Sequence, residues 1–370
     1  MSSCNNFFLN NPTNLLPKNI TEKILRNSNS YAFHKSFVEY NLSPLHHLPA
    51  LSRFLKISEL FVKDESFRFG LNSFKVLGAS YAVNKILQQN PGILTFCSAT
   101  DGNHGKGLAW SAKKHKKECV IYVPRHTSKS IIKSITDQGA KVVQLDLNYD
   151  QTCMYALKKS QTMKWQLVQD TSWENYEIIP AYIKSGYLTH FIEVDNTINY
   201  TYKSEIDFIF LQCGVGSWAA SCIWYYLNKY GKKKPKIILI EPKESDGVFE
   251  SFVNSKRSVP KGTLKTIMDG LNCGIPSKSA WEIIKVGCDA VLKIEDSDVK
   301  NTMKLMYNPF KNDRKIISGE SGAAGLAGLI KCLKIKELKK HLGIGKKSKV
   351  LLFSTEGDTN PKSFKNIINN

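Results

Sequence analysis

One lysine stands where its side chain could act as a nucleophile. Lys75 follows Asn72 and Ser73, which are good N-cap residues, and it falls in the first turn of an apolar-periodic helix expected over 73–90. The positive end of the helix dipole disfavours an ammonium there, and the apolar neighbours on both sides disfavour it further by desolvation. Both effects predict a lowered pKa and a more nucleophilic amine. The alternative is an ordinary solvated lysine.

A glycine-rich turn offers a place for an anion. It lies between a buried strand expected over 206–211 and a helix over 218–229, and it consists of Gly214, Val215, Gly216 and Ser217. Glycines let successive backbone N–H groups converge, and the helix N-terminus adds positive potential. The pattern predicts a phosphate cradle, with a tight turn as the alternative. It is not the dinucleotide fingerprint, because the third glycine of that motif is missing.

Polar side chains also follow three other expected strands. These side chains are Asp101 and Asn103 after 93–98, Asp170 after 167–169, and Ser354 and Thr355 at the end of 349–354. Ligand sites in α/β sheets gather at the carboxyl ends of the strands. Backbone N–H groups of the loop 101–105 could bind a carboxylate, while capping of the next helix is the alternative role of Asp101. An aspartate in an ordinary loop is the alternative for Asp170.

The elements that must position these residues alternate along the chain. Strand and helix follow each other every 20–30 residues, which predicts parallel sheets in an α/β fold. We expect a small α/β domain over 92–172, and a large domain formed by 1–91 and 173–370. Residues 1–30 are expected to be a loosely held arm of the large domain. Residues 321–340 are expected to form one long helix rich in glycine and alanine.

Composition excludes several classes of protein. The chain has 370 residues and a formal net charge of +20, but its lysines are dispersed and lack interleaved aromatics, which disfavours a nucleic-acid partner. The charge should still attract anionic ligands. No run of 18 apolar residues and no signal peptide is seen, so we expect a cytoplasmic protein without a membrane span. The nine cysteines form no C-x-x-C pair, and no His/Cys cluster has zinc spacing, so no metal is expected.

The motifs together resemble a known family. Ser73-Phe74-Lys75 followed by Gly78-Ala79 resembles the Schiff-base lysine motif of the fold-type-II pyridoxal-phosphate (PLP) enzymes, such as threonine and serine dehydratases, threonine synthase and the tryptophan synthase β chain. The longer stretches 63–78, 169–176 and 268–274 resemble the diaminopropionate ammonia-lyases within that family. The resemblance implies two parallel or mixed-sheet α/β domains of the tryptophan synthase β-like architecture. It also implies a PLP cofactor and a homodimer.

The resemblance assigns a role to most of these residues. Lys75 would carry the Schiff base, the turn 214–217 would hold the cofactor phosphate, and Asn103 would contact the ring hydroxyl. Ser354 is the first choice for a hydrogen bond to the pyridine nitrogen, and Thr355 is the second. Glu320 falls in the family's glycine- and alanine-rich segment near the ring, although an acid favoured by a helix N-terminus is an equally good interpretation.

The implied reaction is the α,β-elimination of 2,3-diaminopropionate, as the D or L isomer or both, to pyruvate and two ammonia. Because the α-hydrogens of the two isomers point to opposite faces of the cofactor, Lys75 would be the base for one isomer and Asp101 for the other. Asp170 would bind the β-ammonium, and His104 would fix the loop structurally. The alternatives are a threonine/serine dehydratase, another PLP-dependent β-eliminating lyase of this fold, and a non-enzymatic basic binding protein.

Overall fold

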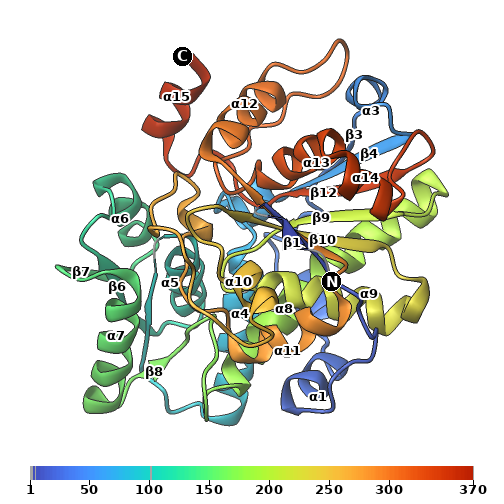
Figure 1. The fold of residues 1–370 in the computed structure, drawn as a ribbon. Coiled ribbons are helices and arrows are strands. Elements are labelled where there is room, and N and C mark those ends of the chain that lie inside the picture. The colour runs from blue at the N-terminus through green and yellow to red at the C-terminus, as the bar shows by residue number, and fades with distance from the viewer. Residues whose placement is uncertain (1–2, 5, 101, 370) are drawn as a thin grey trace.

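The strands of the chain form two separate sheets. The structure is a computed structural model that describes residues 3–4, 6–100 and 102–369 (Figure 1). The larger sheet runs, in spatial order, β1 (Ser3–Cys4), β2 (Phe7–Leu9), β11 (Ala290–Ile294), β10 (Lys236–Pro242), β9 (Phe208–Gln212), β12 (Lys349–Ser354), β4 (Glu59–Asp64) and β3 (Leu45–His47). The smaller sheet runs β7 (Lys141–Leu145), β6 (Glu118–Pro124), β5 (Thr95–Ala99) and β8 (Gln166–Leu167).

Helices surround both sheets. In chain order the α-helices are α1 (Ile20–Arg26), α2 (Ser30–Lys35), α3 (Pro49–Leu55), α4 (Lys75–Gln89), α5 (Asn103–Lys114), α6 (Lys129–Thr136), α7 (Tyr149–Met163), α8 (Ile178–Thr197), α9 (Ser217–Tyr230), α10 (Gly247–Val253), α11 (Lys278–Gly287), α12 (Asp296–Tyr307), α13 (Ala324–Lys334), α14 (Lys336–Leu342) and α15 (Pro361–Asn369). Short helical turns lie at η1 (Glu65–Gly70), η2 (Ile198–Tyr202), η3 (Gly231–Lys233) and η4 (Asp269–Leu271). None of the described helices is long and apolar enough to cross a membrane.

Five adjacent strands of the larger sheet are parallel, from β11 through β10, β9 and β12 to β4, and antiparallel strands flank them. β12 comes near the end of the chain and still lies in the middle of the sheet. Its Leu351 pairs with Ile209 on one side and with Phe61 on the other, and all three side chains are buried. Such unbroken apolar strands are typical of parallel sheets covered on both faces.

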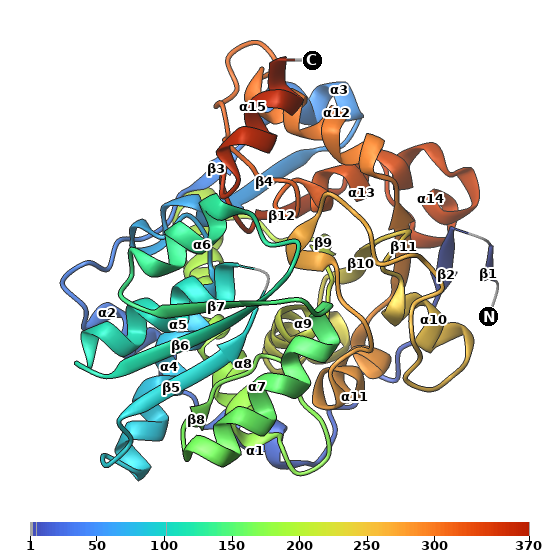
Figure 2. The ribbon, with the colours of Figure 1, turned by 90° about the vertical axis from the view of Figure 1, so that its left-hand side faces the viewer.

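The smaller sheet is entirely parallel and lies with α5, α6 and α7 to one side of the molecule (Figure 2). Its strands fall between residues 95 and 167. The α/β fold with parallel and mixed sheets is confirmed. The division into domains at 92–172 stays a prediction.

Two long helices approach each other unusually closely under the larger sheet. A Cβ added at Gly186 on α8 would lie 2.2 Å from the carbonyl oxygen of Leu77 on α4. Only a glycine therefore allows α8 to come this near. The contact fixes the start of α4, where Lys75 lies.

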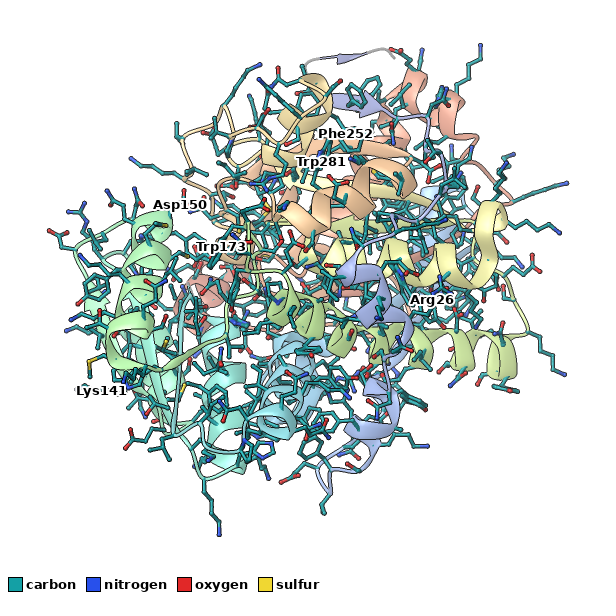
Figure 3. All side chains as sticks on the ribbon, turned by 90° about the horizontal axis from the view of Figure 1, so that it is seen from below. Arg26, Lys141, Asp150, Trp173, Phe252 and Trp281 are labelled. Carbon is teal, nitrogen blue, oxygen red and sulfur yellow. The ribbon has the colours of Figure 1, made fainter. Side chains whose placement is uncertain are left out.

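Two expectations are wrong. The arm 1–30 is not loosely held throughout, because Phe7–Leu9 form β2, which pairs with β11, and their side chains are buried. Phe8 stacks on Phe252 of α10 at 5.3 Å between ring centroids. Phe252 in turn contacts Trp281 of α11, with their centroids 4.9 Å apart (Figure 3). The burial of its aromatic side chains in the core anchors β2. The sequence did not predict this, because most of the residues around the strand are polar.

The expected single helix over 321–340 is two helices, α13 and α14. The break falls at Ile335, whose backbone is extended (φ −86°, ψ 101°). Residues 329–342 contain no glycine and no proline, so the sequence gave no sign of the break.

Candidate active site

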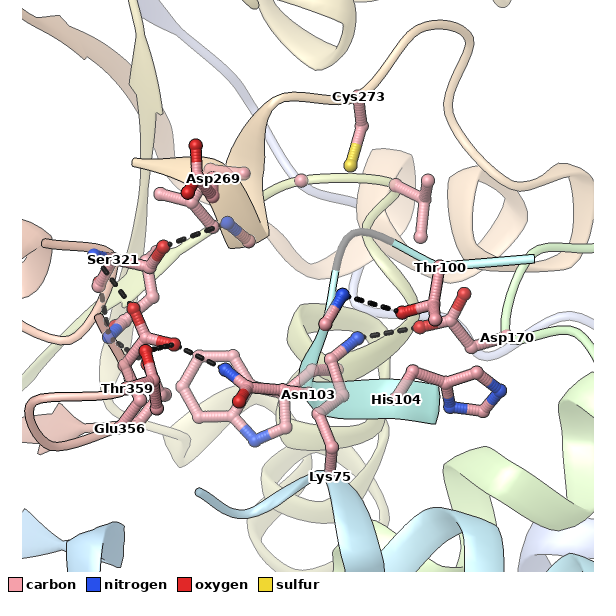
Figure 4. A pocket seen from close by; sticks show the side chains of 18 of the residues that line it. Lys75, Thr100, Asn103, His104, Asp170, Asp269, Cys273, Ser321, Glu356 and Thr359 are labelled. Atoms are coloured by element: carbon pink, nitrogen blue, oxygen red, sulfur yellow. Dashed lines mark hydrogen bonds and ion pairs between the residues drawn. The ribbon is translucent and has the colours of Figure 1, made fainter. Parts of the chain in front are cut away.

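A cavity opens where the carboxyl ends of strands from both sheets face each other. Most of the residues predicted from the sequence line it: Lys75, Asn103, Asp170, Gly214, Val215, Gly216, Ser217, Glu320 and Thr355 (Figure 4). They come from both sheets and from segments more than 200 residues apart. Asp101 lies outside the described residues.

Lys75 is the first residue of α4, which confirms its expected place in the first turn. The expected N-cap is wrong in part, because the N-cap position is Phe74 and no side chain caps the helix there. Ser73 Oγ accepts the backbone N–H of Lys75 at 3.3 Å, and the amide of Asn72 instead donates to Asp358 Oδ1 at 3.0 Å.

The Lys75 amine is paired with a carboxylate, which overturns the expected lowering of its pKa. Nζ donates to Asp170 Oδ2 at 2.6 Å. Burial alone would lower the lysine pKa, but the charge of Asp170 outweighs it and raises that pKa above its ordinary value. For Asp170, burial would raise the pKa, and Lys75 more than offsets this and lowers it to about 2. Sequence reasoning missed this because the two residues are 95 positions apart.

The glycine turn has the conformation that an anion cradle needs. Gly216 adopts φ +87° immediately before α9, and a Cβ there would lie 2.7 Å from Ile284 Cδ1. The first N–H groups of a helix have no partner within the helix and point outward from its end. Ser217 Oγ donates to the backbone carbonyl of Asp170 at 2.5 Å, so the turn is joined to the loop that holds the carboxylate.

Asn103 is held from across the cavity by an acid that sequence reasoning did not single out. Its amide nitrogen donates to Glu356 Oε2, and Glu356 Oε1 accepts the backbone N–H of Ser321 at 3.1 Å (Figure 4). Glu356 is buried, and burial together with the Glu320 carboxylate raises its pKa to about 7. The sequence signal was its place two residues after the strand end at Ser354.

The last strand brings Thr355 to the cavity and not Ser354. Ser354 is fully buried, and its hydroxyl donates to Ser318 Oγ at 2.8 Å. Thr355 lines the cavity and accepts from Gln212 Nε2 at 3.0 Å. That amide also donates to the carbonyl of Phe353, which fixes its orientation and leaves the Thr355 hydrogen to donate elsewhere. Gln212, at the end of β9, is a second residue that sequence reasoning missed.

Glu320 and His104 complete the wall. Glu320 lines the cavity and accepts from Ser363 Oγ at 2.6 Å, and burial raises its pKa. His104 is buried, its Nε2 lies 2.8 Å from the carbonyl oxygen of Val168, and burial lowers its pKa. This contact joins α5 to the chain after β8, which favours the predicted structural role.

Comparisons with known proteins agree with one another. The family model described as "Pyridoxal-phosphate dependent enzyme" matches residues 38–356. Diaminopropionate ammonia-lyase of Salmonella typhimurium is 36% identical over 381 residues, which cover 96% of this chain and 93% of that protein. The holo structure of diaminopropionate ammonia lyase from Escherichia coli has a TM-score of 0.90 at 31% identity, covering 98% of this chain and 96% of that one.

The E. coli enzyme has also been solved with an aminoacrylate–PLP azomethine reaction intermediate. That structure has a TM-score of 0.88 at 32% identity, and the match covers 98% of each chain. The similarity therefore extends over both sheets and the cavity between them.

Proposed function

The chain belongs to the pyridoxal-phosphate dependent enzymes, and from this premise we propose that it catalyses the α,β-elimination of 2,3-diaminopropionate to pyruvate and two ammonia. The observation that carries the proposal is the Lys75–Asp170 pair, 2.6 Å apart in a cavity that also holds the glycine turn. An amine, an anion cradle and a carboxylate for a second ammonium are the groups that this reaction needs.

The residues present fit the cofactor. The turn at Gly216 has no room for a side chain and aims helix N–H groups into the cavity, as a phosphate requires. Lys75 would hold the aldehyde, Asn103 would contact the ring hydroxyl, and Thr355 would donate to the ring nitrogen. When bound, PLP supplies an electron sink for negative charge at the α-carbon of the substrate.

The chain's own residues would then bind the substrate and move its protons. Asp170 is ionised beside the Lys75 ammonium, which lowers its pKa to about 2. Once the cofactor engages Lys75, the β-ammonium of the substrate would take the place of that ammonium at the carboxylate. Lys75 Nζ would take the α-proton of one isomer, and Asp101 is proposed as the base for the other. Glu356 would keep the Asn103 amide directed at the cofactor.

The reaction balances with one water and no oxidant. The C–H bond at the α-carbon breaks, and its electron pair forms the new double bond. The C–N bond at the β-carbon breaks as well, and the β-ammonium takes that electron pair and leaves as ammonia. The released 2-aminoacrylate tautomerises to an imine, which water hydrolyses to pyruvate and the second ammonia. The β-hydroxyl of serine is uncharged, so it could not form an ion pair with the Asp170 carboxylate.

The experiment is a comparison of substrates on the purified protein with PLP. Pyruvate is measured from D- and L-2,3-diaminopropionate, serine and threonine under the same conditions. We expect diaminopropionate to exceed serine by at least about tenfold in kcat/KM, because a carboxylate discriminates for a charged group. Faster turnover of serine or threonine would instead assign the chain to the dehydratases.

Two further features are proposed from the sequence. The protein would be a homodimer, as the family resemblance implies, and light scattering would test this. It would be cytoplasmic, and fractionation would test that.

A further inference from the structure

A second buried lysine lies behind the cavity without a carboxylate at its amine. Lys184 is on α8, its side chain is fully buried, and Nζ donates to Ser279 Oγ at 2.9 Å and to the Pro180 carbonyl at 3.4 Å. No carboxylate in the part of the chain that the structure describes forms an ion pair with its amine, whose two hydrogen-bond acceptors are uncharged. Fully buried lysines are rare unless they are paired, so this charge requires an explanation.

The Lys184 amine ends a cluster of three buried hydroxyls, those of Ser172, Ser277 and Ser279. Ser172 Oγ lies 2.7 Å from Ser277 Oγ and 2.8 Å from Ser279 Oγ. The backbone N–H of Ser172 donates to Ser277 Oγ at 2.9 Å, and that of Ser279 donates to Ser172 Oγ at 2.8 Å. Each hydroxyl is thus engaged from at least two sides, which makes the cluster rigid.

This hydroxyl cluster connects the two parts of the wall that face a ligand. Ser172 follows Asp170 by two residues, and the backbone N–H of Ser277 donates to the carbonyl of Val215 in the glycine turn at 2.8 Å. Ser217 Oγ closes the loop by donating to the Asp170 carbonyl at 2.5 Å. Lys184 is therefore hydrogen-bonded to the structure that holds both the carboxylate and the turn in place.

The charge on Lys184 is sensitive to pH near neutrality. Burial lowers the Lys184 pKa to about 7, although the negative charges of Asp170 and of Glu177, at the start of α8, oppose this lowering. From α11, Lys278 pairs with Glu177 at 2.8 Å and weakens that attraction. On the cavity side, Asp170 is already neutralised by Lys75. Lys184 carries its charge in mild acid and loses it in mild base.

We propose that Lys184 is a positioning residue whose counter-ion is the phosphate held at the glycine turn. The hydroxyl cluster transmits its position to Val215, and its charge adds to the potential of the α9 N-terminus. This inference deepens the proposed function and rests on it, since the ligand there is PLP. We expect the charge of Lys184 to strengthen binding of the phosphate by about tenfold, because the burial that removes water from the amine also weakens the screening of its charge.

The test separates the charge of Lys184 from Schiff-base chemistry. Pyridoxine 5′-phosphate has an alcohol in place of the aldehyde and cannot react with Lys75, so its Kd for the cofactor-free full chain reports binding of the phosphate and ring alone. Equilibrium dialysis at pH 6 and pH 9 gives this Kd for the wild type, Lys184→Met, and the matched control Lys158→Met, which removes an exposed lysine on α7.

Lys184→Met should bind about tenfold more weakly than the wild type at pH 6 and equally at pH 9, because the wild-type charge is then gone. The Lys158→Met control should match the wild type at both. A ratio that does not change with pH would overturn the inference, since a purely structural cluster is indifferent to the charge. Lys184→Gln, which can still donate to Ser279, gives the same readout if the methionine variant does not fold. No binding to the wild type at either pH would overturn the cofactor assignment as well.

Discussion

Two fully buried lysines, Lys63 and Lys184, occupy very different surroundings. Lys63 on β4 pairs with Glu193 at 2.7 Å, and Glu193 in turn binds Arg68, which also binds Glu65. Two cations and two carboxylates thus neutralise one another, all with no exposure to solvent. Lys184 meets only hydroxyl and carbonyl groups.

Burial lowers the pKa of both lysines, so burial alone does not distinguish their roles. What differs is the partner. A cation whose counter-ion is part of the chain contributes to the folded state, and removing it leaves charges unbalanced. A cation whose counter-ion is absent from the chain disfavours folding, and its retention points to a ligand. The three changes below test this distinction.

The largest effect should come from the lysine that faces the ligand directly. Lys75→Ala removes the amine that would hold the cofactor and move the substrate proton. We expect pyruvate formation from diaminopropionate to fall at least about 10³-fold, and the visible absorbance of the Schiff base to disappear. A visible spectrum and a pyruvate assay of the purified variant measure both, with Lys158→Met as the control. Persistent Schiff-base absorbance would mean that another amine holds the cofactor.

The second effect concerns stability in the neutralised cluster. Lys63→Met leaves two carboxylates, Glu65 and Glu193, to share the single guanidinium of Arg68 in a region closed to water. Breaking such a buried pair costs about 3 kcal/mol in the free energy of unfolding. Urea denaturation at pH 7 measures the loss. An unchanged or higher stability would show that the cluster does not need the second cation, and the proposed contrast would then fail.

The same substitution at Lys184 should act in the opposite direction. Lys184→Met removes an unpaired buried charge, and we expect it to stabilise the cofactor-free protein by about 2 kcal/mol at pH 6, after the lost hydrogen bonds are subtracted. The folded pKa of about 7 lies below the unfolded value. The unfolded chain therefore binds more protons between about pH 7 and 10, and wild-type stability rises with pH across that window.

The advantage of Lys184→Met is consequently full below pH 7 and absent near pH 10. Urea denaturation of both proteins at pH 6, 8 and 10 measures this convergence. A gain of the same size at every pH would indicate better apolar contacts in place of a removed charge.

Sequence patterns predicted the helices and strands well, but they predicted poorly which distant side chains bond to each other. Strand ends and glycine turns are local, so the turn at Gly216 and the strand end at 354–355 could be located from their neighbours. The Lys75–Asp170 bond joins residues 95 apart, and it reversed the sign of the expected pKa shift. The sequence around Lys184 showed nothing unusual, because the residue falls in an ordinary helical pattern. Its burial depends on the packing of α11, which carries Ser279. The choice between Ser354 and Thr355 depended on which face of a buried strand met the cavity.

The central place of β12 has a consequence for how the chain is made. The ribosome has completed β4 and β9 long before it reaches residue 349, yet these two strands pair with β12 and not with each other. The nascent chain must therefore hold two half-sheets apart until residues 349–354 have emerged. A premature stop codon before residue 349 would leave both halves with an exposed apolar edge of the kind that aggregates and recruits chaperones.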